Sequence, residues 1–214
     1  MPQADGALTV RTMTPEQIRD EPPLCVDLDG TLMPGDSTVR LGRWLALRRP
    51  WLVPAMACWN RKSRAFLKQE IARRAPFDAA AQRYNRALLA WLGEEKAQGR
   101  RLVLASGSDH RIVAAAAVHL ALFDEFLASD GSTNFAGAAK AAGLAARYGT
   151  FDYVGNSRKD VAVWRMARRC YFVGNDPSLR TWLGRRVNFA RMFPGDWTSD
   201  ESVIRAVQSA DQTL

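Results

Sequence analysis

Two aspartates stand two residues apart at the end of a short apolar run. Asp27 and Asp29 close the run at 24–28, which we predict to be a buried strand, and Gly30 and Thr31 follow in a sharp turn. In an extended chain, this spacing points both carboxylates to the same side. With a divalent cation, one carboxylate can attack phosphorus and the other can protonate the departing oxygen. An Asp-rich turn without chemistry is the alternative, but the preceding strand and the following Gly-Thr favour phosphoryl transfer.

A second polar group follows the apolar run at 101–105. Ser106 and Gly107 connect this predicted strand to a helical pattern that begins near residue 109. Backbone N–H groups at a helix start attract anions, and a serine hydroxyl adds a donor. A helix cap alone would explain these residues, but their position one strand after Asp27 favours a phosphate site. Thr31 is a further hydroxyl that could donate to phosphate or cap the next segment.

Lys140, Asn156 and Asp160 complete the candidate set. Lys140 lies at or just inside a predicted helix start, where its charge could neutralise a phosphate oxygen and steady the Asp27 carboxylate; an ordinary surface lysine is the alternative. Asn156 and Asp160 follow the apolar run at 151–154. Mg²⁺ prefers hard oxygen donors, so Asn156 could bind it through the amide oxygen and Asp160 through a water molecule.

The candidate residues follow predicted strands that alternate with helices. Apolar runs predict strands at 24–28, 101–105, 126–128, 151–154 and 171–173, with helical patterns at 109–120 and 159–168. This alternation implies right-handed crossovers and a parallel sheet, hence an α/β fold. Ligands bind at the carboxyl ends of the strands in such a sheet, so the groups around Asp27, Ser106 and Asn156 should meet in one crevice.

Residues 36–98 interrupt the alternation. They hold no good strand pattern and divide into three or four helical stretches, so we predict a helical insertion between the first and second strands. The core is then expected at 23–35 and 99–214, after a polar, proline-broken, flexible leader at 1–22. Four tryptophans are expected to form the insertion's own core, with a substrate-facing or membrane-facing place for one or two as the alternative. They are Trp44, Trp51, Trp59 and Trp91.

The positive charge is concentrated in the same region. The formal net charge is +8, yet residues 40–101 hold 15 Lys and Arg against 4 Asp and Glu, and the remainder holds 15 against 18. A solvated helical surface would explain this balance. The functional alternative is a lid that attracts an anionic substrate or an anionic membrane surface. Nucleic-acid binding is not expected, because no nucleic-acid motif accompanies the charge.

The sequence gives limited information on cellular location and on cysteine chemistry. No stretch of about 18 or more apolar residues predicts a membrane span, and the first residues lack the basic start and apolar core of a signal peptide. We therefore expect a cytoplasmic protein, with contact at a membrane periphery as a further option. The three cysteines are widely spaced, which argues against a disulfide framework or a zinc site.

In this order, the motifs resemble those of the haloacid dehalogenase-like hydrolase superfamily. The match runs from about residue 24 to residue 183, and its most specific part is Val26-Asp27-Leu28-Asp29-Gly30-Thr31. The resemblance implies a Rossmann-like parallel-sheet core with a helical C1-type cap, as in phosphoserine phosphatase-like members, the insertion being the cap. It also implies a phosphatase, because the dehalogenase branch lacks an acid at the position of Asp29.

Site roles are also implied by the resemblance. Asp27 is the nucleophile, Asp29 is the general acid/base, and Ser106 and Lys140 hold the phosphoryl group.

The resemblance further implies a magnesium ion. It is bound by Asp27, the Asp29 backbone carbonyl and Asn156, with Asp160 supporting the site. The family usually has an acidic residue where Asn156 stands. A neutral amide there predicts weaker magnesium binding rather than loss of activity.

A closer similarity is to the phosphatase-like domain fused ahead of membrane prenyltransferases of the 4-hydroxybenzoate polyprenyltransferase type. It is carried by residues 105–109, 123–131 and 153–164. It implies an anionic small-molecule or lipid-linked phosphate as substrate, and peripheral contact with a membrane or with such a prenyltransferase. The alternative is a catalytically weak binding or regulatory module that keeps the fold.

Overall fold

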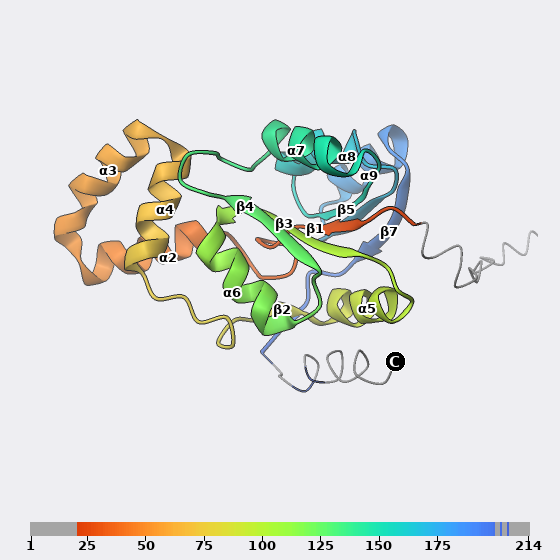
Figure 1. The fold of residues 1–214 in the computed structure, drawn as a ribbon, viewed down its shortest axis with the longest axis horizontal. Helices are drawn as coiled ribbons and strands as arrows, with labels where there is room; N and C mark the ends of the chain where they lie inside the picture. The colour runs from red at the N-terminus through yellow and green to blue at the C-terminus, as the bar shows by residue number, and fades with distance from the viewer. Residues whose placement is uncertain (1–20, 200–201, 203–204, 206–214) are drawn as a thin grey trace, which may run out of the picture.

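The computed structural model describes residues 21–199, 202 and 205, so the predicted leader lies outside the described residues except for its last two. At its centre is a six-stranded sheet of order β4-β3-β1-β5-β6-β7, in which every neighbouring pair is parallel (Figure 1). The strands are β1 (Leu24–Val26), β3 (Leu102–Asp109), β4 (Glu125–Ser129), β5 (Asp152–Gly155), β6 (Cys170–Val173) and β7 (Phe189–Phe193). The predicted α/β class with a parallel sheet is confirmed.

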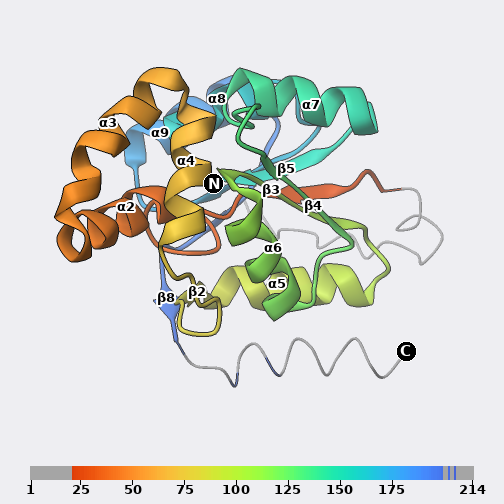
Figure 2. The ribbon, with the colours of Figure 1, turned by 60° about the vertical axis from the view of Figure 1, so that its left-hand side comes forward.

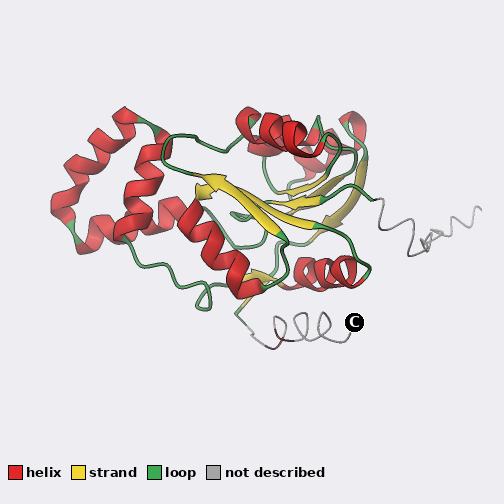
Figure 3. Cartoon of the chain, viewed as in Figure 1, coloured by secondary structure: helices red, strands yellow, loops and turns green. Residues whose placement is uncertain are grey.

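Helices cover both faces of this sheet (Figure 3). On one face lie α5 (Arg86–Ala97) and α6 (His110–Leu120); on the other lie α7 (Ala138–Tyr148), α8 (Val161–Trp164) and α9 (Pro177–Arg186). Because side chains alternate along a strand, Leu24 and Val26 pack with the first pair, while Cys25 packs with the second group. The central strand β1 is therefore apolar on both sides, as a doubly covered parallel strand must be.

Some elements differ from their predicted extent. The strand predicted at 101–105 continues to Asp109, and the helix predicted at 159–168 is a 3₁₀ turn (Arg158–Asp160) followed by the single turn of α8. The insertion, predicted to hold no strand, contains β2 (Tyr84–Asn85), which pairs antiparallel with β8 (Trp197–Thr198). Two residues are too few to leave an alternating pattern in a sequence.

Three helices project from one side of the core as a helical arm, residues 37–74 (orange in Figures 1 and 2). They are α2 (Ser37–Arg48), α3 (Val53–Lys62) and α4 (Arg64–Arg74), with a 3₁₀ turn (Pro50–Leu52) between the first two. The side chain of Asp36 caps α2 by accepting from the backbone N of Val39 at 3.1 Å. Ser63 caps α4 in the same way, through the backbone N of Phe66 at 2.9 Å. These caps explain where the helices of the arm begin.

The fourth helix of the predicted insertion packs on the sheet instead. Trp91 of α5 lies with its ring centroid 4.8 Å from that of Tyr171 and 5.0 Å from that of Phe193, both on the sheet. The expectation that Trp91 belongs to a separate core of the insertion is therefore wrong. It is also wrong for Trp51, whose residue surface is 71% exposed. The partly buried Trp44 packs against the core cluster of the first face.

A buried ion network lies at the amino ends of the strands. Arg100, just before β3, forms an ion pair with Asp152, the first residue of β5, and both are buried. Arg100 also pairs with Glu95 at 2.6 Å, and Arg168 pairs with Asp152 at 2.8 Å. Each buried charge thus has opposite charges beside it, which offsets the large cost of removing it from water.

Candidate active site

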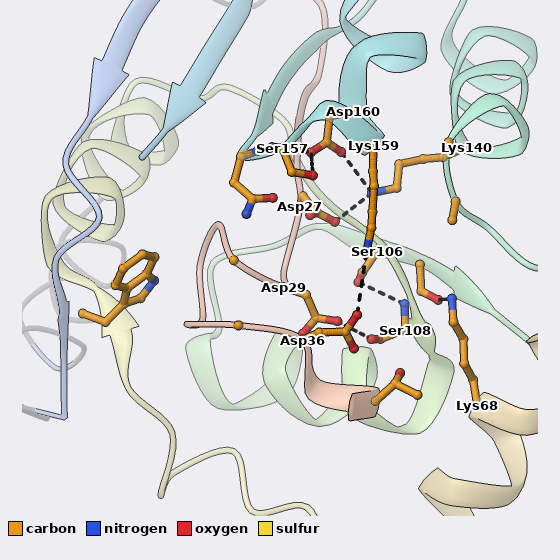
Figure 4. A pocket seen from close by; sticks show the side chains of 18 residues that line it. Asp27, Asp29, Asp36, Lys68, Ser106, Ser108, Lys140, Ser157, Lys159 and Asp160 are labelled. Atoms are coloured by element: carbon orange, nitrogen blue, oxygen red, sulfur yellow. Dashed lines mark hydrogen bonds and ion pairs between the residues drawn. The ribbon is translucent and has the colours of Figure 1, made fainter. Parts of the chain in front are cut away.

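A cavity of about 460 Å³ opens at the carboxyl ends of β1, β3 and β5, on the side of the helical arm (Figure 4). Seven of the residues predicted from the sequence line it, namely Asp27, Asp29, Ser106, Gly107, Lys140, Asn156 and Asp160. The structure thus brings the polar groups of three strand ends to one place.

Asp27 follows β1 directly and is 7% exposed. The Nζ of Lys140, the third residue of α7, donates to Asp27 Oδ1 at 2.7 Å. Burial raises the pKa of Asp27 to about 7, and the Lys140 charge opposes this rise. Burial also acts against the charge of Lys140, but Asp27 and Asp160 outweigh it, so the pKa of Lys140 is raised. The pair is therefore a carboxylate held by an ammonium group in a site that largely excludes water.

Tyr153 and Asp160 hold this ammonium group from the other side. Lys140 Nζ donates to the Tyr153 hydroxyl at 2.9 Å, and that hydroxyl donates to Asp160 Oδ1 at 2.8 Å. Asp160 Oδ2 accepts from the backbone N atoms of Asn156 at 3.2 Å and Ser157 at 3.1 Å. Both oxygens of Asp160 are thus engaged in shaping the loop after β5 and in placing Lys140.

Asp29 lies on the arm side of the cavity. Its oxygens accept from the backbone N and the Oγ of Ser37, each at 3.0 Å, and from the Oγ of Ser108. Burial raises the pKa of Asp29, and the hydrogen bonds from Ser108 and Ser37 oppose this rise. A raised pKa keeps a carboxyl group protonated over a wider pH range, which suits a proton donor.

Gly30 lets Asn156 approach the turn after β1. Its φ is +76°, a left-handed conformation that favours glycine. A Cβ at this position would lie 2.0 Å from Asn156 Nδ2. Any other residue would therefore push the Asn156 side chain out of its place beside the Asp27–Asp29 turn.

The oxygen donors at this place fit a divalent cation only in part. Asp27 and Asn156 line the same cavity, and both offer the hard oxygen atoms that Mg²⁺ prefers. However, no group of three or more His, Cys, Asp or Glu side chains in the described part of the chain could hold a metal ion. The amide of Asn156, in place of a carboxylate, lowers the count of acidic ligands in the cavity.

Ser106 and Gly107 are placed differently from the prediction. They lie inside β3 rather than at a helix start, because β3 runs to Asp109 and α6 begins only at His110. The pairing of β3 with β4 shifts register between Ala105 and Asp109. This irregular stretch turns the strand end toward the cavity, so both residues still line it, and the predicted helix-start anion site is wrong.

Thr31 lies away from the cavity lining. Its side chain is fully buried, and its Oγ1 has no hydrogen-bond partner among the described residues. Its backbone N donates to Leu28 O at 3.4 Å, within the turn after β1. This placement gives no support to the predicted role in phosphate binding.

Lys68 is a cavity residue that sequence reasoning missed. It extends from α4 of the helical arm, and its Nζ donates to Gly107 O at 2.5 Å and to Asn134 Oδ1 at 2.7 Å. Burial lowers the pKa of Lys68. Figure 4 shows it reaching the cavity from the arm, while Lys140 reaches it from α7. A substrate anion in this cavity would therefore have a lysine on each side.

Comparison with known proteins decides the family. The family model described as haloacid dehalogenase-like hydrolase matches residues 24–165, well over half of the chain. The chain is a haloacid dehalogenase-like hydrolase.

One curated relative matches most of this chain. It is 29% identical over 155 residues to the uncharacterized protein y4nM of Sinorhizobium fredii; the match covers 72% of this chain and 30% of that protein. The hydrolase thus spans less than a third of the length of this relative.

Solved structures share the fold of this hydrolase. A hydrolase of the same family from Salmonella enterica serovar Typhi has a TM-score of 0.55 at 13% identity, over 86% of this chain and 72% of that one. A probable phosphoserine phosphatase from Vibrio cholerae has a TM-score of 0.51 at 14% identity, over 92% and 69%. The predicted superfamily is confirmed, whereas the similarity to prenyltransferase-fused domains stays a prediction.

Proposed function

We propose that this hydrolase is a magnesium-dependent phosphomonoesterase that acts through an acyl phosphate (aspartyl phosphate) on Asp27. The observation that carries the proposal is the buried Asp27–Lys140 pair, 2.7 Å apart, with Asp29 in the same cavity. A carboxylate held beside a cation can attack phosphorus, and a second carboxyl group with a raised pKa can deliver the proton that the leaving group needs. Hydrolysis of an aryl phosphate with and without Mg²⁺ tests it.

The reaction has two steps. In the first, an Asp27 carboxylate oxygen forms a bond to phosphorus while the bond from phosphorus to the ester oxygen breaks, and Asp29 gives its proton to that oxygen. In the second, water attacks phosphorus as Asp29 takes a proton from it, and the bond between phosphorus and Asp27 breaks. Inorganic phosphate leaves and both carboxyl groups return to their starting states. Lys140 and Lys68 face the negative charge on the transferred group from two sides.

Asp27, the backbone carbonyl of Asp29 and Asn156 would hold the cation. When bound, Mg²⁺ supplies positive charge that neutralises the phosphate and draws electrons from phosphorus. Asp160 acts indirectly, because its oxygens position Lys140, Tyr153 and the loop that carries Asn156.

We expect Asn156→Asp to strengthen Mg²⁺ binding by roughly tenfold, because a full negative charge replaces a neutral amide close to the cation. Isothermal titration of the protein with Mg²⁺ measures this without any turnover. Asn175→Asp, an exposed position at the end of the next strand, β6, is the matched control and should leave the affinity unchanged. Equal affinities for all three proteins would show that Asn156 does not bind the cation.

The leaving group would sit in a second, mostly apolar cavity. This cavity, of about 330 Å³, lies within the helical arm and shares Asp36, Thr38 and Lys68 with the first. Its walls are mainly apolar side chains of α2, α3 and α4, including Val39, Ala46, Met56, Leu67 and Ile71. A phosphate in the first cavity therefore has apolar surface beside it, which supports a substrate with an apolar or lipid-like group.

A series of linear alkyl phosphates tests this substrate class. We expect kcat/KM to rise with chain length, by up to about fourfold per methylene until the cavity is full. Met56→Ser should flatten the series, because it makes the wall polar, and Met166→Ser, a 50% exposed position on the core, should not. A kcat/KM that is independent of chain length would exclude an apolar leaving group.

One observation favours a second candidate, a member that binds phosphate esters with little turnover. It is that, among the described residues, no three His, Cys, Asp or Glu side chains are grouped so that they could hold a metal ion. Mg²⁺-dependent hydrolysis of an aryl phosphate separates the two candidates, since only the first requires it.

A further inference from the structure

The helical arm carries uncompensated positive charge. Residues 37–69 contain eight Lys and Arg and no Asp or Glu. All but Lys68 are exposed. The carboxylates at either end of this stretch face other cations, since Glu70 pairs with Arg73 and Arg74 and Asp36 lies 4.0 Å from Lys159. In the part of the chain that the structure describes, the seven exposed cations therefore have no acidic partner.

Apolar side chains stand out from the same surface, at the corner where α2 passes into α3. Leu47 is 82% exposed, Trp51 is 71% exposed and Val53 is 47% exposed. Arg48 and Arg49 lie between Leu47 and Trp51 in the same stretch of seven residues, 47–53. Exposed apolar groups gathered in one place indicate an interaction surface, because leaving them in water is unfavourable.

Helix α3 is the least buried of the three arm helices, although its Met56 packs against the core cluster. None of its residues is buried. Its most exposed side is apolar near Val53 and Ala57 and basic at Arg61 and Lys62. In Figures 1 and 2 this helix forms the outer end of the arm, away from the sheet. The corner and α3 thus present one continuous basic and apolar surface, which we call the arm tip (residues 47–62).

We propose that the arm tip binds the surface of a membrane that contains anionic lipid. Arginine and lysine side chains are attracted to anionic headgroups, tryptophan is favoured at the boundary between headgroups and hydrocarbon, and aliphatic side chains gain by entering it. A purely electrostatic ligand such as a nucleic acid would leave Leu47, Trp51 and Val53 without a partner. Among the described residues, no helix is long and apolar enough to cross a membrane.

The affinity follows from the charges near the surface. Each Lys or Arg close to an anionic membrane strengthens binding roughly fivefold at physiological ionic strength. Binding should therefore be reversible and should weaken as salt is added.

Cosedimentation with lipid vesicles tests the proposal. The wild-type chain should bind vesicles of equal parts phosphatidylserine and phosphatidylcholine, and should not bind phosphatidylcholine alone. The combined variant Arg48→Gln, Arg49→Gln, Arg61→Gln should bind about 100-fold more weakly. The combined variant Arg180→Gln, Arg185→Gln, Arg186→Gln removes the same charge from exposed positions of α9 and should bind like wild type.

The contribution of the apolar side chains of the arm tip to membrane binding is tested separately. Trp51→Ser should weaken binding to the anionic vesicles at least about fivefold, whereas Val118→Ser, an 80% exposed position on α6, should not. Thermal unfolding shows whether each variant is folded, and the assay does not depend on phosphatase activity. Equal losses in the two arginine variants, or equal binding to both kinds of vesicle, would refute the proposal. So would binding to duplex DNA, lost in the arm variant, without binding to vesicles.

Discussion

Asp27→Asn is expected to lower the Mg²⁺-dependent hydrolysis of an aryl phosphate by at least about 10⁴-fold, because an amide cannot form the acyl phosphate that the carboxylate forms. The amide is nearly the same size as the carboxylate and still accepts from Lys140, so the fold should persist. Mass spectrometry after an acid quench should find added phosphate on the Asp27 peptide of the wild type and none in the variant.

Asp196→Asn, a change of the same kind at an exposed position, is the control and should keep wild-type activity. Turnover in Asp27→Asn within tenfold of wild type would remove Asp27 from the mechanism. No turnover in the wild type, with any of a broad set of phosphate esters, would instead favour the binding module.

Asp29→Asn is expected to slow hydrolysis by about 10²–10⁴-fold, the usual contribution of a positioned acid/base. The loss should be larger for an alkyl phosphate than for 4-nitrophenyl phosphate, because the nitrophenolate departs without a proton. Since Asp29 also activates water in the second step, the acyl phosphate on Asp27 should accumulate in this variant when 4-nitrophenyl phosphate is used.

Two measurements check the role of Asp29. Rates for the alkyl phosphate and for 4-nitrophenyl phosphate show whether the loss depends on the leaving group. An acid quench shows whether the phosphorylated Asp27 intermediate accumulates. Equal losses for both esters, with no accumulation, would mean that Asp29 only positions other groups through Ser37 and Ser108.

The central part of the site could be predicted from the sequence because its signals are local. The Asp27 and Asp29 carboxylates sit two residues apart after the three-residue apolar strand β1, and Asn156 directly follows the buried four-residue strand β5. Parallel pairing then brings these ends together whatever the details of the sheet. The role of Lys140 could be predicted only with the family resemblance, because a lysine near a helix start is common. Its partner, Asp27, lies 113 residues away in the sequence.

Other parts of the site depend on packing that the sequence does not reveal. Lys68 is one of ten Lys and Arg residues in the arm, and only the fold selects it to reach Gly107. Ser106 was assigned to a turn because the irregular pairing of β3 after Ala105 leaves no pattern of its own. The chain of hydrogen bonds from Lys140 through Tyr153 to Asp160 links three elements, so no short stretch of the sequence predicts it.

The fourth helix of the insertion shows a similar limit. A helix with an apolar stripe looks the same whether a sheet or another helix covers the stripe. The division of residues 36–98 into three or four helical stretches therefore did not reveal what covers the last of them, and Trp91 was placed in the wrong layer.

The Arg100–Asp152 ion network and the catalytic cavity lie at opposite ends of the same strands. The ion pairs that stabilise the sheet are thus separate from the residues of the candidate active site. A descendant that lost its reactive carboxylates would retain the charges that tie the strand starts together, and would survive as an intact scaffold free to acquire another duty. In such a lineage, the protein would still fold and keep its cellular abundance after turnover had ceased.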